Sequence, residues 1–289
     1  MSRVLDRPTG ALLGGVVRTG MLFQQRTGRT PAVSYAAMRR LFGVGDGKQF
    51  DRLAAATRTS APLQLHASSG LLADAEVRAK ALAELRADGV TVLANGLPES
   101  HCDALQRLAE SAECVLYGRW PDAPQRGVFP PSAPVAAKYE VPELDLARCE
   151  AAQAIVADES LLALAQDYFG ATPINDLLTM WWSAPGPTGS ESEVAQQFHF
   201  DLDRLRFLKL FVYLTDVTEE SGPHVYLRGT HHGLPARLRA PRRYTDSEVG
   251  SELMSRALRL CGPRGTMFLA DTIGLHKGLP VVEGNRLVF

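Results

Sequence analysis

Residues 197–214 read QFHFDLDRLRFLKLFVYL and contain two runs rich in β-forming residues, 198–202 and 207–214. Side chains two positions apart in a strand project to the same face of a sheet. His199 and Asp201 therefore lie on one face of the first run, where an imidazole and a carboxylate converge. The pattern predicts a pair of metal ligands on one strand of a β-rich protein.

A second His-x-Asp triplet, His101-Cys102-Asp103, lies at the predicted start of a helix. Ser100 and Asp103 stand at capping-box spacing, which explains Asp103 as a helix-capping residue. Residues i and i+2 of a helix do not face each other. We therefore interpret this triplet as structural and assign the chemistry to the triplet at residues 199–201.

A His and a carboxylate on one strand, joined by a His from a distant strand, form the facial triad of non-haem Fe(II) oxygenases. The candidates for the third ligand are His224, His231, His232 and His276. We prefer His276 because it ends the apolar strand MFLADTIGL, and because Arg286 follows ten residues later at the start of the last β-type run. An arginine there can bind the far carboxylate of 2-oxoglutarate through two parallel hydrogen bonds, while the 2-oxo acid end chelates the metal.

Helical periodicity precedes the β-type runs along the chain. A helix from residue 76 is expected to end at Gly89, a strand follows over 90–93, and a helix from about Ser160 ends at Gly170. Six prolines within 121–142 predict an ordered but irregular loop. Further β-type runs cover 177–182, 224–227, 266–270 and 286–289. This order predicts a mainly β fold with flanking α-helices, in which a sandwich or barrel core has helices packed outside it.

The composition is that of a folded, soluble protein: 289 residues, 45% apolar and 22% charged, with a formal net charge of -1. The longest apolar segment, GALLGGVV at residues 10–17, is far shorter than the ~20 residues that a membrane span needs. The mixed-charge start does not fit a secretory signal. Four cysteines without CxxC spacing are expected to be reduced thiols. We expect a cytoplasmic protein with no membrane partner.

The first quarter of the chain differs from the rest in charge. Residues 1–70 contain ten Lys and Arg against three Asp, a net charge of +7, so the remainder carries -8. A short helix capped by Ser34 is predicted to run through Phe42 and to stop at Gly43, and a second helix is predicted from Gln49 to Ala56. We interpret residues 1–75 as a basic helical extension packed on a domain of residues 76–289. A nucleic-acid-binding arm is the less favoured alternative, since the segment has no interleaved aromatic residues and no known binding motif.

Four segments resemble the phytanoyl-CoA dioxygenase family of Fe(II)- and 2-oxoglutarate-dependent oxygenases. They read ADGVTVLANGL, QQFHFD, YLTDVTEESGPHVYLRGTHH and RGTMFLADTIGLHKGLPVVEGNR. The third is the most specific, because Gly222-Pro223 and the ending Gly229-Thr230-His231 are similar to the family's NGPL...PGSH segment. The resemblance covers residues 76–289 and implies a double-stranded β-helix, that is, a cupin-like jelly roll.

The resemblance also implies roles for individual residues. It gives the iron ligands as His199, Asp201 and His276, and the cosubstrate contacts as Arg286, Phe211 and Lys209. Phe211 stands where the family has an aromatic residue beside 2-oxoglutarate, and Lys209 lies on the same strand face, where it can meet a carboxylate. The chain departs from the family at Phe200, where relatives often carry Gln, and at Gly278, where relatives can carry a hydroxyl.

The implied enzyme binds Fe(II), 2-oxoglutarate and O2 and hydroxylates an unactivated C–H bond of a small molecule, with release of succinate and CO2. The carboxylate of Asp201 argues against halogenation, because halogenating relatives have a small residue there. Two alternatives stay open. One is a cupin-like metalloenzyme that does not use 2-oxoglutarate, and the other is an inactive jelly-roll binding module.

Overall fold

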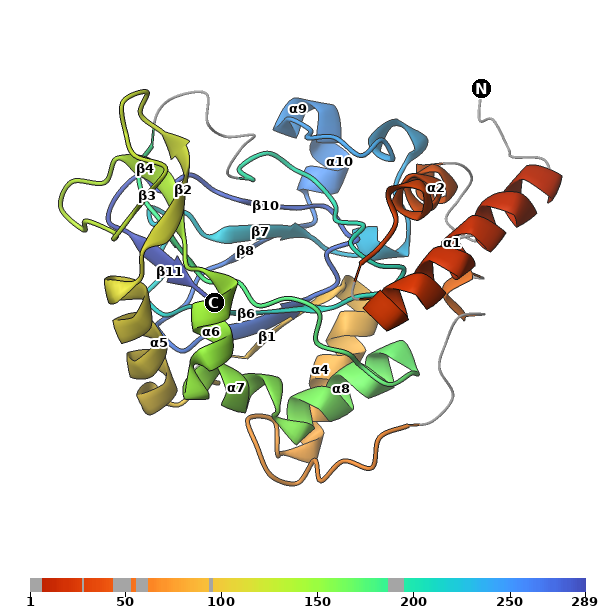
Figure 1. The fold of residues 1–289 in the computed structure, drawn as a ribbon, viewed down its shortest axis with the longest axis horizontal. Helices are drawn as coiled ribbons and strands as arrows, with labels where there is room; N and C mark the ends of the chain where they lie inside the picture. Colours follow the sequence, from red (N-terminus) through yellow and green to blue (C-terminus); the bar gives the residue numbers. More distant parts are fainter. Residues whose placement is uncertain (1–6, 28, 44–52, 56–61, 94–95, 187–194) are drawn as a thin grey trace.

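The computed structural model describes residues 7–27, 29–43, 53–55, 62–93, 96–186 and 195–289 (Figure 1). Its helices are α1 (Arg7–Thr27), α2 (Ala32–Gly43), α4 (Ala75–Asp88), α5 (Glu99–Ser111), α6 (Glu143–Arg148), α7 (Glu150–Val156), α8 (Glu159–Phe169), α9 (Asp246–Val249) and α10 (Ser251–Met254), with short 3-10 turns at Thr230–His232 and Ala236–Leu238. Its strands are β1 (Val90–Leu93), β2 (Cys114–Arg119), β3 (Arg126–Gly127), β4 (Ala136–Glu140), β5 (Trp181–Ser183), β6 (Lys209–Val212), β7 (His224–Leu227), β8 (Ala257–Leu260), β9 (Met267–Ala270), β10 (His276–Gly278) and β11 (Arg286–Val288).

The strands form three antiparallel sheets in the orders β1-β9-β6, β11-β5-β4-β2-β3 and β10-β7-β8. The first two are joined, because Val212 and Phe289 exchange backbone hydrogen bonds and Leu214 N–H donates to the carbonyl of Leu287. We call this combined layer the large sheet, and β10-β7-β8 the small sheet. His199 extends the small sheet by an antiparallel bridge to His276.

The two sheets face each other across a shared apolar core. Phe211 and Phe268 of the large sheet belong to the same buried cluster as Tyr226 and Leu260 of the small sheet. The two phenylalanine rings stack with centroids 4.7 Å apart. Burial of each phenylalanine side chain away from water contributes about 1.5–3 kcal/mol to the free energy of folding. The expected antiparallel sheets with helices packed outside them are therefore present, but the described residues have a mixed α and β content rather than a mainly β one.

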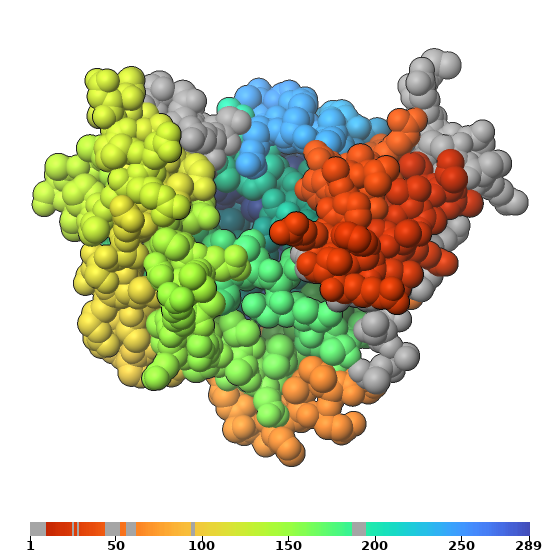
Figure 2. All heavy atoms as spheres, in the orientation of Figure 1, coloured from red at the N-terminus to blue at the C-terminus, as the bar shows by residue number. Residues whose placement is uncertain are grey.

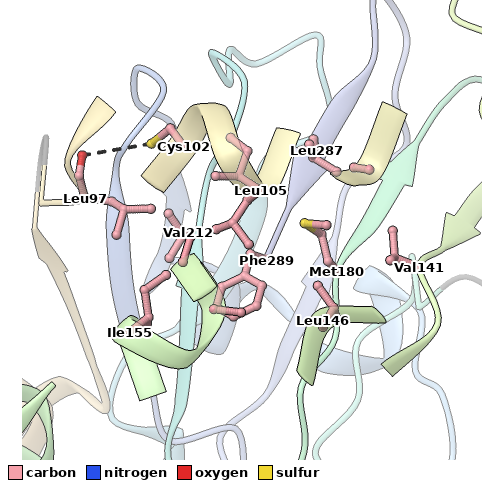
Figure 3. Close-up of a cluster of buried hydrophobic side chains, with 14 of the residues drawn as sticks. Leu97, Cys102, Leu105, Val141, Leu146, Ile155, Met180, Val212, Leu287 and Phe289 are labelled. Carbon is pink, nitrogen blue, oxygen red and sulfur yellow. Dashed lines mark hydrogen bonds between the residues drawn. The ribbon is translucent and has the colours of Figure 1, made fainter. Parts of the chain in front are cut away.

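Helices α5, α6 and α7 cover the outer face of the large sheet (Figure 1). Figure 3 shows this second core, where Leu105 of α5, Leu146 of α6 and Ile155 of α7 lie near Val212 and Phe289. All of these side chains are buried. The helical layer thus holds the large sheet from behind and leaves its inner face to the small sheet.

Local signals placed two helix ends correctly. Helix α4 ends at Gly89 with a φ of 82°, and α8 ends at Gly170 with a φ of 61°. Both glycines adopt the left-handed conformation that closes a helix and that other residues rarely adopt. The Asp74 side chain, which accepts from two backbone N–H groups, fixes the start of α4.

Other local predictions were wrong. Ser100 does not cap α5, which begins at Glu99 after Pro98 without a side-chain cap. Asp103 instead pairs with Arg264 at 2.6 Å, so the triplet around it is structural, but not for the reason given by capping. The segment predicted as an irregular loop contains β3 and β4. Strands β2 and β8 were also missed, because pairing with neighbouring strands, rather than an apolar run, specifies them.

The N-terminal segment packs on the small sheet. Val17 of α1 and Met38 and Leu41 of α2 share a buried cluster with Phe198 and Phe200. Helix α1 was not expected, and it is the longest helix in the described part of the chain. Among the described residues, no helix has the length and the apolar content that crossing a membrane requires.

The expected cap of α2 was also wrong, because Ser34 lies within the helix and donates its hydroxyl proton to the carbonyl of Val16. The helix predicted from Gln49 to Ala56 falls mostly outside the described residues.

Candidate metal centre

Three side chains meet at the edge of the small sheet: His199, Asp201 and His276. His199 and His276 exchange backbone hydrogen bonds of 3.0 and 2.9 Å, so their side chains leave neighbouring strands from paired positions. Their ring centroids lie 4.2 Å apart. The pairing continues where Asp201 N–H donates to the carbonyl of Thr272 at 2.8 Å. Backbone pairing therefore brings His276 next to two residues that precede it by 77 and 75 positions, His199 and Asp201.

The ligand atoms of these residues are close enough to share one ion. One donor atom from each residue lies within 4.8 Å of the others. Nε2 of His276 is 3.4 Å from Oδ2 of Asp201, and Nε2 of His199 is 3.9 Å from Oδ1. Ligands at right angles around an ion, with bonds of about 2.1 Å, lie about 3 Å apart, so a small contraction of this cluster completes a site.

The backbone fixes which ring nitrogen of each histidine is available. Nδ1 of His199 lies 2.9 Å from the carbonyl oxygen of Gln197, and Nδ1 of His276 lies 2.9 Å from that of Gly274. A carbonyl oxygen only accepts, so each Nδ1 carries the proton and each Nε2 presents a lone pair toward Asp201. This is the tautomer that binds a metal ion.

Electrostatics keep the cluster in the protonation state that a metal requires. Burial, assisted by the neighbouring His276, lowers the pKa of His199 to about 3, so its imidazole is neutral. Burial alone would raise the pKa of Asp201, but His276 and the ammonium of Lys209 outweigh burial and hold the pKa well below 3.8. A neutral imidazole at His199 and an ionised carboxylate at Asp201 result, which are the states in which these two groups bind a metal ion.

Lys209 lies beside the carboxylate. Its Nζ is 2.7 Å from Oδ2 of Asp201 and 3.2 Å from Oδ2 of Asp203. Burial would lower the pKa of Lys209, but the two carboxylates outweigh burial and raise it, so the ammonium stays charged. The structure therefore places Lys209 at a carboxylate of the protein itself, and its predicted contact with 2-oxoglutarate stays a prediction.

Arg286 is buried, with 6% of its surface exposed. Its guanidinium donates to Oγ of Ser183 on β5 at 3.1 Å, and Nε has no hydrogen-bond partner among the described residues. Burial lowers its pKa, and the described part of the chain supplies no carboxylate against it. A buried guanidinium without a counter-charge is unfavourable unless an anion binds.

Phe211 and His224 form a cluster of rings beside His276. The ring of Phe211 stacks on Phe268 and lies 4.9 Å from the ring of His224. The ring of His224 is nearly parallel to that of His276, with centroids 5.4 Å apart. Sequence reasoning had placed His224 only among candidate third ligands, and the described residues bring it beside the triad rather than into it.

The middle residue of the His-x-Asp triplet, Phe200, turns away from the ligands. It is buried, and its ring lies 4.9 Å from that of Phe42 on α2. The N-terminal helices therefore support the segment that carries His199 and Asp201. The basic charge of residues 1–70 gave no sign of this contact, which depends on apolar side chains. The strand expected over 198–202 was wrong in extent, because this segment pairs only through isolated bridges at Phe198 and His199.

The remaining histidines lie elsewhere. His231 and His232 stack on each other in a 3-10 turn, with ring centroids 3.9 Å apart. Burial, followed by the charge of His232, lowers the pKa of His231 to about 4. His101 lies in α5. None of these residues belongs to the cluster formed by the triad.

A comparison with protein families identifies the class of protein to which the chain belongs. Residues 85–282 match the family model of phytanoyl-CoA dioxygenase (PhyH). The chain belongs to the phytanoyl-CoA dioxygenase family. The matched range contains all three residues of the triad, and Arg286 lies four residues beyond its end.

Solved structures show the same fold. One is the non-haem alpha-ketoglutarate-dependent carbocyclase SnoK from nogalamycin biosynthesis, with a TM-score of 0.51, 14% identity, and coverage of 79% of this chain and 85% of that one. Another is EctD from S. alaskensis with bound Fe, with a TM-score of 0.51, 22% identity, and 80% of each chain covered. A search of curated proteins finds no match. At these identities the likeness concerns the fold alone.

Two features of this phytanoyl-CoA dioxygenase family member escaped sequence analysis. Ser183 holds Arg286 from the neighbouring strand, and only strand pairing brings them together. Asp271 is fully buried at the end of β9, where its carboxylate accepts from the hydroxyl of Tyr168 at 2.7 Å. The only sign of this role in the sequence was an acidic residue within an apolar run. Asp271 secures the turn that leads from β9 to His276.

Proposed function

We propose that this protein is an Fe(II)- and 2-oxoglutarate-dependent dioxygenase that binds iron through His199, Asp201 and His276. The observation that carries the proposal is that the protein contains both this triad and Arg286, a buried cation without a counter-charge among the described residues. The family match supports the oxygenase class. The likeness to SnoK and EctD supports the interpretation that the large and small sheets form a double-stranded β-helix.

The residues fit iron in number and kind. Two imidazoles and a carboxylate are the ligands of the non-haem Fe(II) facial triad, and three protein ligands leave three positions open. A structural zinc site would instead use four protein ligands. His224 does not join the cluster, so the described residues leave positions free for a chelating cosubstrate and for dioxygen.

Arg286 fits the far end of 2-oxoglutarate. The guanidinium fork binds a carboxylate through two parallel hydrogen bonds. Nε and the nitrogens not bound to Ser183 are free to do so among the described residues. A ligand with a chelating 2-oxo acid at one end and a carboxylate at the other would satisfy both the metal and Arg286.

When bound, iron with 2-oxoglutarate and O2 supplies an oxidant that takes hydrogen from a C–H bond, and succinate and CO2 are released. The residues of the chain orient and shield this chemistry. The carbonyls of Gln197 and Gly274 hold the imidazoles in the binding tautomer, and Lys209 holds Asp201. The apolar rings of Phe211 and Phe268 exclude water from one side.

A small molecule is the proposed substrate and hydroxylation the proposed reaction. Figure 2 shows a hollow on one face, between α1 and α2 on one side, α9 and α10 above, and the yellow-green region of β2 to β4 opposite. Atoms in teal and dark blue, the colours of the segments that carry the triad, lie at its floor. The hollow offers a route by which a substrate reaches these segments.

The test is anaerobic reconstitution with Fe(II) followed by 2-oxoglutarate, with the weak visible charge-transfer band of the chelate as the signal. The matched pair of variants is Asp201→Asn and Asp203→Asn, since both carboxylates contact Lys209 but only one belongs to the triad. We expect the first variant to lose the band and the second to keep it.

Absence of the band in the unaltered protein would refute the proposal. Metal binding without succinate formation under air would instead identify the cupin-like alternative. Protein that binds no metal would identify the binding module. Retention of the band in Asp201→Asn would reassign the ligand.

A further inference from the structure

His224 has a position that the proposed iron site does not explain. It begins β7, and the register of β7 with β10 pairs it with Gly278, while Tyr226 pairs with His276. Residues paired across antiparallel strands project to the same face. His224 therefore lies on the face of the small sheet that carries the ligand His276, two residue pairs further along the strands.

Gly278 leaves space beside Arg286. A Cβ atom built at Gly278 would lie 3.5 Å from one terminal nitrogen of the Arg286 guanidinium. Because Gly278 has no side chain, the only side chain of this strand pair at that level is the imidazole of His224. His276 of the triad therefore lies next to His224 on this face. The guanidinium of Arg286 lies near Gly278, the residue opposite His224.

The Nε2 atom of His224 is buried without a partner. Less than 1 Å² of it is exposed, and it has no hydrogen-bond partner among the described residues. Buried polar atoms in folded proteins nearly always have a partner, and an exception calls for an explanation such as a bound ligand. Arg286 Nε is also buried without a partner. His224 and Arg286 each carry one such nitrogen and both residues lie beside Gly278, which indicates a polar ligand between them.

The neighbours of His224 hold its ring in one plane. The ring lies 4.9 Å from Phe211 and is inclined by 15° to that of His276. A neutral imidazole carries one N–H group and can donate one hydrogen bond to a ligand in the site.

We infer that His224 donates a hydrogen bond from Nε2 to the distal carboxylate of 2-oxoglutarate, beside the guanidinium of Arg286. The inference rests on the proposed function, because it requires 2-oxoglutarate to span the triad and Arg286. His224 thereby supplies the polar contact that Gly278 cannot make. In this role His224 binds the cosubstrate and is not a ligand of the metal.

The experiment titrates 2-oxoglutarate anaerobically into Fe(II)-loaded protein and follows the charge-transfer band. The His224→Phe variant keeps a ring against Phe211 and His276 but removes the donor, whereas His224→Gln keeps an N–H donor. The His231→Leu variant is the control for loss of a buried histidine outside the site. A parallel titration uses 2-oxobutanoate, which has the chelating end but no distal carboxylate.

We expect His224→Phe to raise the Kd of 2-oxoglutarate by about 10- to 100-fold, the effect of losing a hydrogen bond to a charged group. The Kd of 2-oxobutanoate and the affinity for Fe(II) should change little. His224→Gln should recover part of the lost affinity, and His231→Leu should bind like the unaltered protein.

An unchanged Kd of 2-oxoglutarate in His224→Phe would overturn the inference and leave the proposed function intact. Equal weakening of both 2-oxo acids would also overturn it, because the contact would then be with the chelating end. If the unaltered protein shows no band with 2-oxoglutarate, the proposed function fails and this inference fails with it. Should His224→Phe not fold, a Kd for His224→Gln well above that of 2-oxobutanoate binding to the same variant would count against the inference.

Discussion

Replacement of Arg286 by Met should stabilise the protein without cosubstrate and abolish the effect of the cosubstrate on its stability. The guanidinium is buried and makes a single hydrogen bond to a side chain, with Ser183, among the described residues. Methionine keeps much of the apolar stem and removes the charge. The unbound protein therefore loses an unfavourable buried cation and one hydrogen bond.

The magnitude follows from these two opposing changes. Replacing buried ionic groups by apolar side chains of similar volume stabilises some proteins by about 1–4 kcal/mol. The lost hydrogen bond and the unsatisfied Ser183 hydroxyl cost about 1–2 kcal/mol. Taken at their midpoints, these changes give a net gain of about 1 kcal/mol in the free energy of unfolding without 2-oxoglutarate. At a hundredfold excess over its Kd, 2-oxoglutarate should add about 2.7 kcal/mol to the unaltered protein and nothing to the variant.

Urea unfolding of Fe(II)-loaded protein under anaerobic conditions, with and without 2-oxoglutarate, measures both effects. Arg286→Lys is the control, since it keeps a buried charge but loses the bidentate geometry. It should be the less stable variant and should retain only weak cosubstrate binding. A methionine variant that is less stable than the unaltered protein and is still stabilised by 2-oxoglutarate would refute the role of Arg286 as an uncompensated anion-binding cation.

Three further predictions concern the surroundings of the site. Lys209→Met should destabilise the metal-free protein by about 1–3 kcal/mol, since Asp201 loses its charged partner, and added Fe(II) should recover part of this loss in urea unfolding. Phe42→Ala should cost about 3–5 kcal/mol, because it leaves a cavity against Phe200, and should weaken Fe(II) binding in an equilibrium titration. His231 titrates at about pH 4 in the folded protein and near 6.5 when unfolded, so the unfolded chain binds the extra proton and stability falls as the pH drops through that window. His231→Leu should make that fall shallower in unfolding experiments across the window, and an unchanged pH profile would show that the imidazole is not buried.

The chemistry was more predictable than the strands that carry it. The pair His199 and Asp201 could be assigned because alternation in a strand is a local property of two residues. The choice of His276 depended on its spacing from Arg286, and the bridge between His199 and His276 agrees with that choice. The expected single strand over 267–276 was wrong: β9 ends at Ala270, a turn follows, and His276 begins β10 on the other sheet. An apolar run does not reveal such a change of sheet, since both strands are buried.

What sequence patterns missed depends on contacts between distant segments. Strands β2 and β4 pair with each other from 114–119 to 136–140 across a proline-rich connection whose composition is typical of a loop. The packing of α2 on Phe200 joins residue 42 to residue 200, and no local signal encodes such a pair. The isolated nitrogen of His224 is visible only when burial and hydrogen bonds are known. The sequence identified groups that can do chemistry, and the fold determined which of them lack a partner.

The register of one strand pair fixes the geometry of the whole candidate site. His199 and His276 exchange both backbone hydrogen bonds. Each imidazole is also oriented by the backbone carbonyl of the residue two positions before it in the sequence. Ring orientation is therefore local, whereas the distance between the rings depends on pairing. A slip of one residue in this register would turn one imidazole to the opposite face, because side chains alternate along a strand. On its other side β10 pairs with β7, and that register sets His224 opposite Gly278, so the candidate metal site and the proposed cosubstrate contact depend on how β10 aligns with both of its neighbours.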